Sequence, residues 1–164
     1  MISFFAVLVQ TAAEELADLG AGDVEMHSHI SAVLRRLLPA LRIMSKWVKL
    51  HLEYISRFSS TSNGDLAADF PSFWTQYHRF IPTLARLFPL AELPTLTDPF
   101  EEDMDMRGFA PFSRGMLTLN ACVQEINGHH EAPHPNEEQL MRIADLQVDA
   151  KLLMQSEVSL LHES

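Results

Sequence analysis

HSHISAVLRRLLPALRIMSKWVKLHLEYISRF, residues 27–58, decides the fold class of this chain. Its apolar residues recur at spacings of three, four and seven, which keeps them on one face of an α-helix. They are Ile30, Val33, Leu34, Leu37, Leu41, Met44, Val48 and Ile55. Pro39 interrupts the pattern without shifting its register, so the segment is either one long helix kinked at Pro39 or two helices that abut there. Trp47 should anchor the core between helices.

Three further segments have helical periodicity. They span residues 2–19, 69–89 and 136–155. We expect Asp69 to act as the N-cap of the second of these helices, and Pro82 to bend or break it. No convincing strand pattern occurs, so the sequence predicts an all-α fold. We also expect residues 1–164 to form a single helical domain. The first helix is so apolar at its start that it needs a partner to cover it, so we expect the chain to be a fragment of a larger protein.

A long stretch without a clean period, residues 88–115, contains four prolines and predicts an ordered loop. Its last part is EEDMDMRGFAPFSRG, residues 101–115. We expect this part to pack across the helices as a clasp. Phe109 and Phe112 would be its buried apolar anchors, and Gly108 would permit a tight turn.

The acids of that segment are a candidate cation site. They are Glu101, Glu102, Asp103 and Asp105. A calcium loop also needs a glycine and a terminal bidentate Glu at offsets that are not met here. We therefore expect the acids to be solvated, to cap a helix start, or to pair with Arg107 and Arg114. Arg107 should pair with Glu102, Asp103 or Asp105.

Histidines gather in a second predicted loop, NGHHEAPHP, residues 127–135. The candidate metal ligands are His129, His130 and His134, with Cys122 or Glu131 as a further one. Structural zinc sites normally show paired Cys or His ligands at both ends, which this spacing lacks. We expect a solvated loop, with neither a metal nor a cofactor. The single cysteine allows no internal disulfide, which fits a reducing compartment.

Composition and motifs argue against several classes of function, from nucleic-acid binding to catalysis. The formal net charge is -10, which disfavours broad binding to nucleic acid because phosphate contacts need clustered Lys and Arg. One basic cluster exists, for which we expect the solvated side of an amphipathic helix. Its members are Arg35, Arg36, Arg42, Lys46 and Lys49. No nucleophile motif, phosphate-binding glycine loop or membrane-spanning run occurs, so we expect no enzyme, no small-molecule ligand and no membrane association.

Two motifs in this order resemble the Est-type telomerase-activating and SMG-type nonsense-mediated mRNA decay proteins. LLPALRIMSKWV, residues 37–48, looks like that family's Leu-Pro-Ala…Trp helix, and residues 101–115 look like its acidic, Arg-Gly-Phe-x-Pro segment. The resemblance spans about residues 25–156, a helical "DNA/RNA-binding" region that follows a 14-3-3-like domain absent here. The matching positions are Leu38, Pro39, Ala40, Trp47, Glu102, Asp103, Arg107, Gly108, Phe109 and Pro111.

The resemblance implies antiparallel helical hairpins, α-solenoid-like, that act as a non-catalytic scaffold in mRNA surveillance or telomerase regulation. The partners would be proteins of those complexes, in the nucleus or cytoplasm. The alternative is a domain that binds telomeric DNA or telomerase RNA directly in the same pathways. Net charge favours the scaffold, and any direct binding would have to use the basic cluster.

Overall fold

The computed structural model describes residues 2–17, 26–61, 65–96, 99–106, 108–109 and 134–162. Every regular element in these ranges is helical, which confirms the all-α class. Four helices are long: α1 (Ile2–Ala17), α2 (Ala32–Thr61), α3 (Asp65–Leu87) and α6 (Pro135–His162). Three are short: η1 (Met26–His29), η2 (Leu90–Glu92) and α4 (Glu101–Asp105). None of the described helices is both long enough and apolar enough to cross a membrane.

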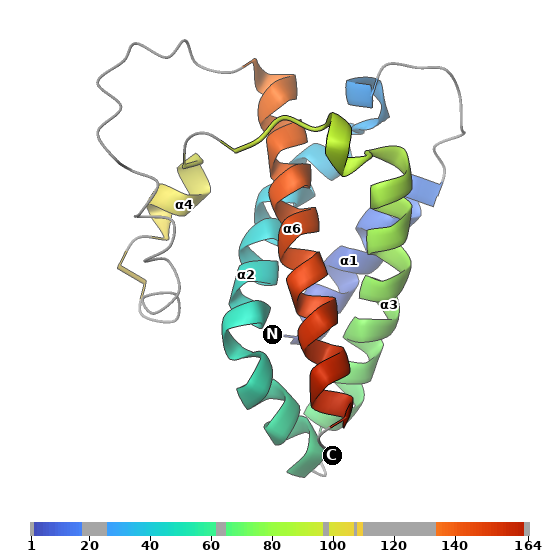
Figure 1. The fold of residues 1–164 in the computed structure, drawn as a ribbon, viewed down its shortest axis with the longest axis vertical. Coiled ribbons are helices and arrows are strands. Elements are labelled where there is room, and N and C mark those ends of the chain that lie inside the picture. Colours follow the sequence, from blue (N-terminus) through green and yellow to red (C-terminus); the bar gives the residue numbers. More distant parts are fainter. Residues whose placement is uncertain are drawn as a thin grey trace.

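Successive long helices run in opposite directions, so α1, α2 and α3 form antiparallel hairpins (Figure 1). The main packing is between helices that are not consecutive: α1 lies against α3, and α2 lies against α6. The short α4 packs on α2, on the outer side of the four long helices (Figure 1). The hairpin arrangement is thus confirmed, while the solenoid-like stacking stays a prediction.

Helix α2 is continuous through Pro39, which settles the choice between one helix and two. A proline removes one backbone donor, and the remaining hydrogen bonds carry the helix past it. The helix begins after Ser31, whose Oγ accepts a hydrogen bond from the Leu34 N–H at 3.0 Å, as an N-cap does. The same hydroxyl donates to Glu15 Oε2 at 2.6 Å and so ties the end of α1 to the start of α2.

Helix α3 also contains its prolines, Pro71 and Pro82, and both face outward. It begins at Asp65, so the expected N-cap at Asp69 is wrong. Leucine and alanine follow Asp65, and these strong helix formers continue the helix on the N-terminal side of Pro71. Helix α6 likewise runs past the expected end at residue 155.

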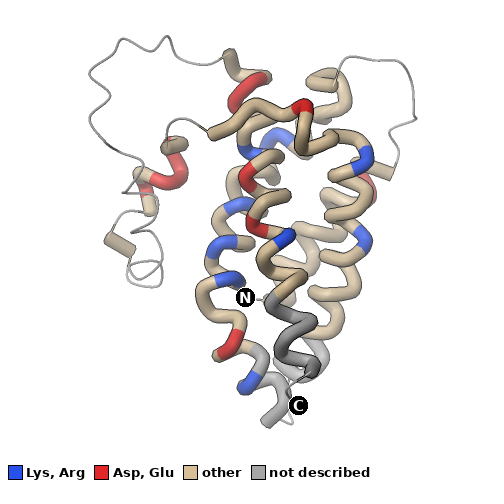
Figure 2. The backbone as a smooth tube through the Cα atoms, in the orientation of Figure 1, with Lys and Arg blue, Asp and Glu red and all other residues tan. Residues whose placement is uncertain are grey.

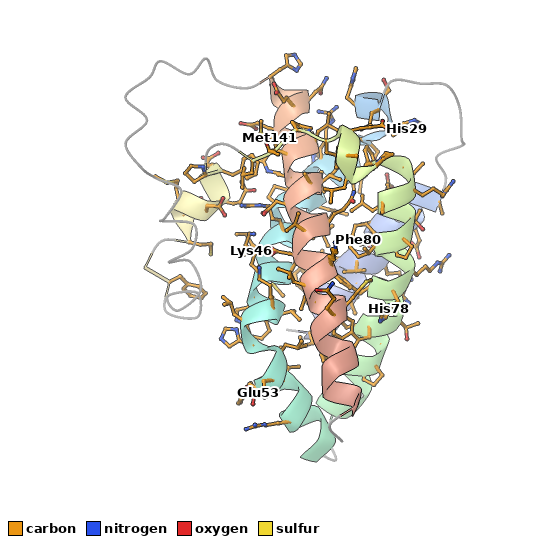
Figure 3. All side chains as sticks on the ribbon, viewed as in Figure 1. His29, Lys46, Glu53, His78, Phe80 and Met141 are labelled. Carbon is orange, nitrogen blue, oxygen red and sulfur yellow. The ribbon has the colours of Figure 1, made fainter. Side chains whose placement is uncertain are left out.

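One hydrophobic core joins α1, α2, α3 and α6. Its centre is aromatic: Phe5 of α1 stacks on Phe73 of α3 with ring centroids 5.0 Å apart, and both side chains are fully buried. On α3, Phe80 lies inside the bundle while His78 lies on the outer side (Figure 3). Trp47 is only half-buried; it contacts the core and stacks on His51 at 4.8 Å. It therefore lies at the margin of the core that we expected it to anchor.

The stretch predicted as a loop, residues 88–115, contains two short helices in its described part, η2 and α4. Phe88 at its start is fully buried. Arg107 and residues 110–115 lie outside the described residues, as does most of the histidine loop. The clasp can therefore be followed from Glu101 to Met106 and at Gly108 and Phe109.

Candidate functional site

Arg42 of α2 is the centre of an ion-pair network between three helices. Its side chain is fully buried. Its two terminal nitrogens grip Asp103 of α4: Nη1 donates to Oδ1 at 2.8 Å and Nη2 to Oδ2 at 2.6 Å. Its Nε donates to Asp145 Oδ2 of α6 at 2.5 Å. A parallel pair of hydrogen bonds between guanidinium and carboxylate fixes both distance and orientation.

A second arginine, Arg142 of α6, holds the neighbouring acid of α4. Its Nε and Nη2 donate to the two oxygens of Glu102 at 2.8 and 2.9 Å. Glu102 also accepts a longer hydrogen bond from Arg42 at 3.3 Å, so the two arginine clamps share one carboxylate. Glu138, one turn before Arg142, accepts from its Nη1 at 3.3 Å.

Phe100 also helps to hold α4 in place. Its side chain is buried, and both guanidiniums lie over its ring, with Cζ 4.7 Å from the centroid for Arg42 and 4.3 Å for Arg142. Cations are attracted to the face of an aromatic ring at such distances. The Phe100 N–H donates to Asp103 Oδ2 at 3.1 Å, which closes the first turn of α4. This short helix is thus fixed by charge and an aromatic ring more than by an apolar face.

The network continues along the α2–α6 interface. Lys46 Nζ lies 2.8 Å from oxygens of both Asp145 and Asp149, and Lys49 pairs with Asp149 as well. The bases of α2 and the acids of α6 occupy neighbouring stretches of these adjacent helices (Figure 2), and Lys46 lies near the middle of α2 (Figure 3). Asp149 is buried, and both lysines pair with its carboxylate.

The network as a whole contains four bases and five acids: Arg42, Lys46, Lys49 and Arg142 with Glu102, Asp103, Glu138, Asp145 and Asp149.

Neighbouring charges decide the protonation states in the network. Burial opposes the charged form of Asp145, but the charges of Lys46 and Arg42 outweigh it and lower the pKa of the carboxyl. Burial acts the same way on Glu102, and its hydrogen bonds with Arg142 bring the pKa below the usual value. Burial also opposes the charge on Arg42, while its bonds to Asp103 and the charge of Asp145 raise its pKa. These pKa shifts favour the charged forms of Asp145, Glu102 and Arg42 at neutral pH.

The basic cluster predicted from sequence divides into two parts. Arg42, Lys46 and Lys49 form the α2 side of the ion-pair network, so they are not the solvated helix face that we expected. Arg35 donates from Nε to the Ile30 carbonyl at 3.2 Å, and Arg36 is exposed. The cluster is therefore split between a buried interface and a solvent-facing end of α2.

Of the alternatives expected for the acidic segment, capping of a helix start is confirmed for Asp103, which accepts a hydrogen bond from the Phe100 N–H at the start of α4. Glu102 and Asp103 bind Arg42 and Arg142, which are remote in sequence, whereas Arg107 lies outside the described residues. Gly108 has φ +79°, a left-handed conformation that glycine adopts without strain, as predicted for a tight turn. Phe109 was expected to be buried, but 52% of its surface is exposed. Immediately after Gly108, the chain turns this ring outward instead of into the helices.

The predicted metal ligands can be followed only in part. His134 Nδ1 accepts a hydrogen bond from the Asn136 N–H at 3.2 Å. His129, His130, Glu131 and Cys122 lie outside the described residues. Within the ranges that the structure describes, no group of three or more His, Cys, Asp or Glu side chains could hold a metal ion.

Residues 1–115 match the protein family described as Est1 DNA/RNA binding domain. The chain belongs to this family. The match covers more than half of the chain and begins earlier than the resemblance at residues 25–156 suggested. Comparisons with curated proteins and with solved structures found no match.

Several members of the network in this Est1-type domain were missed from the sequence. Arg142, Asp145 and Asp149 all belong to α6, which lies beyond the matched residues. A signal for them exists in the sequence: Asp145 and Asp149 are four apart, as are Arg42 and Lys46. Two oppositely charged pairs with one helical spacing can line up along adjacent helices.

Among the motif positions, Leu38 is fully buried, Pro39 is half-buried and Ala40 is exposed on α2. Pro111 lies outside the described residues.

Proposed function

We propose that this Est1-type domain is a non-catalytic helical scaffold in telomerase regulation or nonsense-mediated mRNA decay, and that it works by binding proteins. The observation that supports this most strongly is the ion-pair network. Three of the five bases in the predicted basic cluster are paired with carboxylates of α4 and α6. A base held by a buried carboxylate cannot neutralise a phosphate without breaking that pair.

The bases that remain are few and scattered. In the described part of the chain, five Lys or Arg residues have no ion pair with a carboxylate: Arg35, Arg36, Arg79, Arg86 and Lys151. They belong to three helices, α2, α3 and α6. Nucleic-acid affinity grows with the number of phosphates contacted together, so scattered bases predict weak binding. Partners in telomerase or mRNA-surveillance complexes, in the nucleus or cytoplasm, are part of the same proposal.

Direct binding of DNA or RNA is the second candidate, and the family's description supports it. It would use Arg35 and Arg36, the solvent-facing end of the basic cluster. That the chain is one domain and a piece of a larger factor also stays a prediction.

A titration separates the two candidates. A labelled single-stranded RNA and a DNA of the same sequence are titrated with the full chain at 50 and 200 mM salt, by fluorescence anisotropy. The scaffold proposal predicts no saturable binding at micromolar protein in either salt. The matched variants are Arg35→Gln with Arg36→Gln, and Arg79→Gln with Arg86→Gln as a control on another helix. Micromolar affinity that falls steeply with salt, and that only the first pair abolishes, would overturn the scaffold proposal.

A further inference from the structure

The outer side of α4 combines exposed apolar and acidic residues. We call Glu101, Met104, Asp105 and Phe109 the tip. Met104 is 47% and Phe109 52% exposed, and both carboxylates are exposed as well. Neither Glu101 nor Asp105 has an ion-pair partner among the described residues. In contrast, the inner residues of the same segment, Phe100, Glu102 and Asp103, are all engaged with the arginines.

The tip is held in a fixed position. The segment is clamped through Asp103 to α2 and through Glu102 to α6, so two independent helices determine where it lies. At the far end, the Phe109 N–H donates to the Met106 carbonyl at 3.1 Å across the turn at Gly108. An added Cβ at Gly108 would meet nothing within 4 Å, so glycine is required there for its backbone conformation and not for space. That conformation turns Phe109 outward.

This arrangement is poorly explained by stability. Buried ion pairs contribute little net stability because desolvation offsets the attraction, but they do fix position. Exposed Met and Phe side chains contribute little to the core. Asp105 lies at the C-terminal end of α4, where a negative charge gains nothing from the helix dipole. A rigidly held segment that presents two hydrophobic side chains is instead the arrangement expected of a binding surface.

We propose that the tip docks a basic, amphipathic segment of a protein partner. Met104 and Phe109 contact its apolar face, and Glu101 and Asp105 pair with its lysines or arginines. The charge of the tip selects this occupant, because the two exposed carboxylates, which have no ion-pair partner within the described ranges, repel a polyanion and attract a cationic chain. The proposal deepens the proposed scaffold function by assigning it a surface and a class of partner.

The experiment uses a phage-displayed library of random 16-residue peptides, selected on the immobilised full chain. Selected peptides are synthesised, and their affinities are measured by fluorescence anisotropy. The tested variants are Phe109→Ala, Met104→Ala and Asp105→Asn. The matched control is Val148→Ala, which removes an equally exposed apolar side chain (47%) from α6. Thermal unfolding of each variant shows whether the fold is kept.

The tip proposal predicts peptides rich in Lys or Arg together with Leu, Ile or Phe. Phe109→Ala should weaken their binding about tenfold or more, as loss of an interface hot spot does. Asp105→Asn should weaken it about two- to fivefold and reduce its salt dependence, while Val148→Ala should leave it unchanged.

Three results would overturn the proposal: no selected binder, binders without basic and apolar residues, or binders that tolerate Phe109→Ala as well as Val148→Ala. In the last case the peptides bind elsewhere, and the scaffold function survives without the tip. The scaffold function itself is tested by a different experiment. It would be overturned by salt-dependent binding of RNA or DNA through Arg35 and Arg36.

Discussion

Replacing Asp103 with Asn tests whether the ion-pair network holds α4 on the helices. The side chain keeps its shape but loses its charge, so Arg42 keeps only Asp145 at 2.5 Å and Glu102 at 3.3 Å as charged partners. Removing one partner of a buried ion pair typically costs about 3–5 kcal/mol. Because two carboxylates remain, we expect the lower end, about 3 kcal/mol. Domains are stable by only about 5–15 kcal/mol, so the loss is readily measurable.

The assay is urea unfolding of Asp103→Asn, Arg42→Met and the double variant. Removal of Asp103 should matter less once Arg42 is gone, so the double variant should be more stable than the sum of single effects predicts, by about 2 kcal/mol. Hydrogen exchange over residues 100–106 separates local release of α4 from global unfolding. A loss below about 1 kcal/mol for Asp103→Asn, with exchange over these residues unchanged, would refute the clamp.

Three further outcomes are expected. Phe73→Ala should lower the free energy of unfolding by about 3–5 kcal/mol, and Phe109→Ala by less than about 1 kcal/mol, because only the first ring is buried; equal losses in urea unfolding would contradict this. Tyr77→Phe should lower the free energy of unfolding by about 1–3 kcal/mol, because the buried Ser45 hydroxyl loses its hydrogen-bond partner at 2.8 Å. In thermal unfolding, the double variant Tyr77→Phe with Ser45→Ala should recover part of this lost stability. In the folded state the pKa of Glu102 is lowered from 4.5, so the ionised carboxylate stabilises the fold above about pH 4.5. This stabilisation is lost as the pH falls through the lower, folded-state pKa. The urea concentration at the midpoint of unfolding should therefore decrease below about pH 4.5, and it should decrease less in Glu102→Gln.

Local patterns in the sequence predict the helices well. The spacing of Leu34, Leu41, Val48 and Ile55 places them on one face of α2, and all four are buried. The helical periodicity of residues 69–89 is likewise confirmed, because Phe73, Tyr77 and Phe80 on one side of α3 are fully buried. These residues are predictable because one helix has only one face that can turn toward a core.

The candidate site was less predictable for a physical reason. Arg42 bonds to residues 61 and 103 positions away, and no local pattern tells a helix which remote acid will meet its base. The prediction that Arg107 pairs with the acids of α4 stays a prediction, because Arg107 lies outside the described residues. The predicted burial of Phe109 is wrong: aromatic residues usually lie inside, and only the position of α4 reveals that this one is exposed.

The network also determines how much of the chain is needed for the fold. Residues 1–115, the stretch that identifies the family, include Arg42, Lys46, Lys49 and the acids of α4, but not α6. A fragment cut at residue 115 would leave both lysines without their carboxylates and would uncover the side of α2 that α6 covers. We therefore expect the unit that folds to be longer than residues 1–115, the unit that matches the family. Fragments for expression should keep residues through α6.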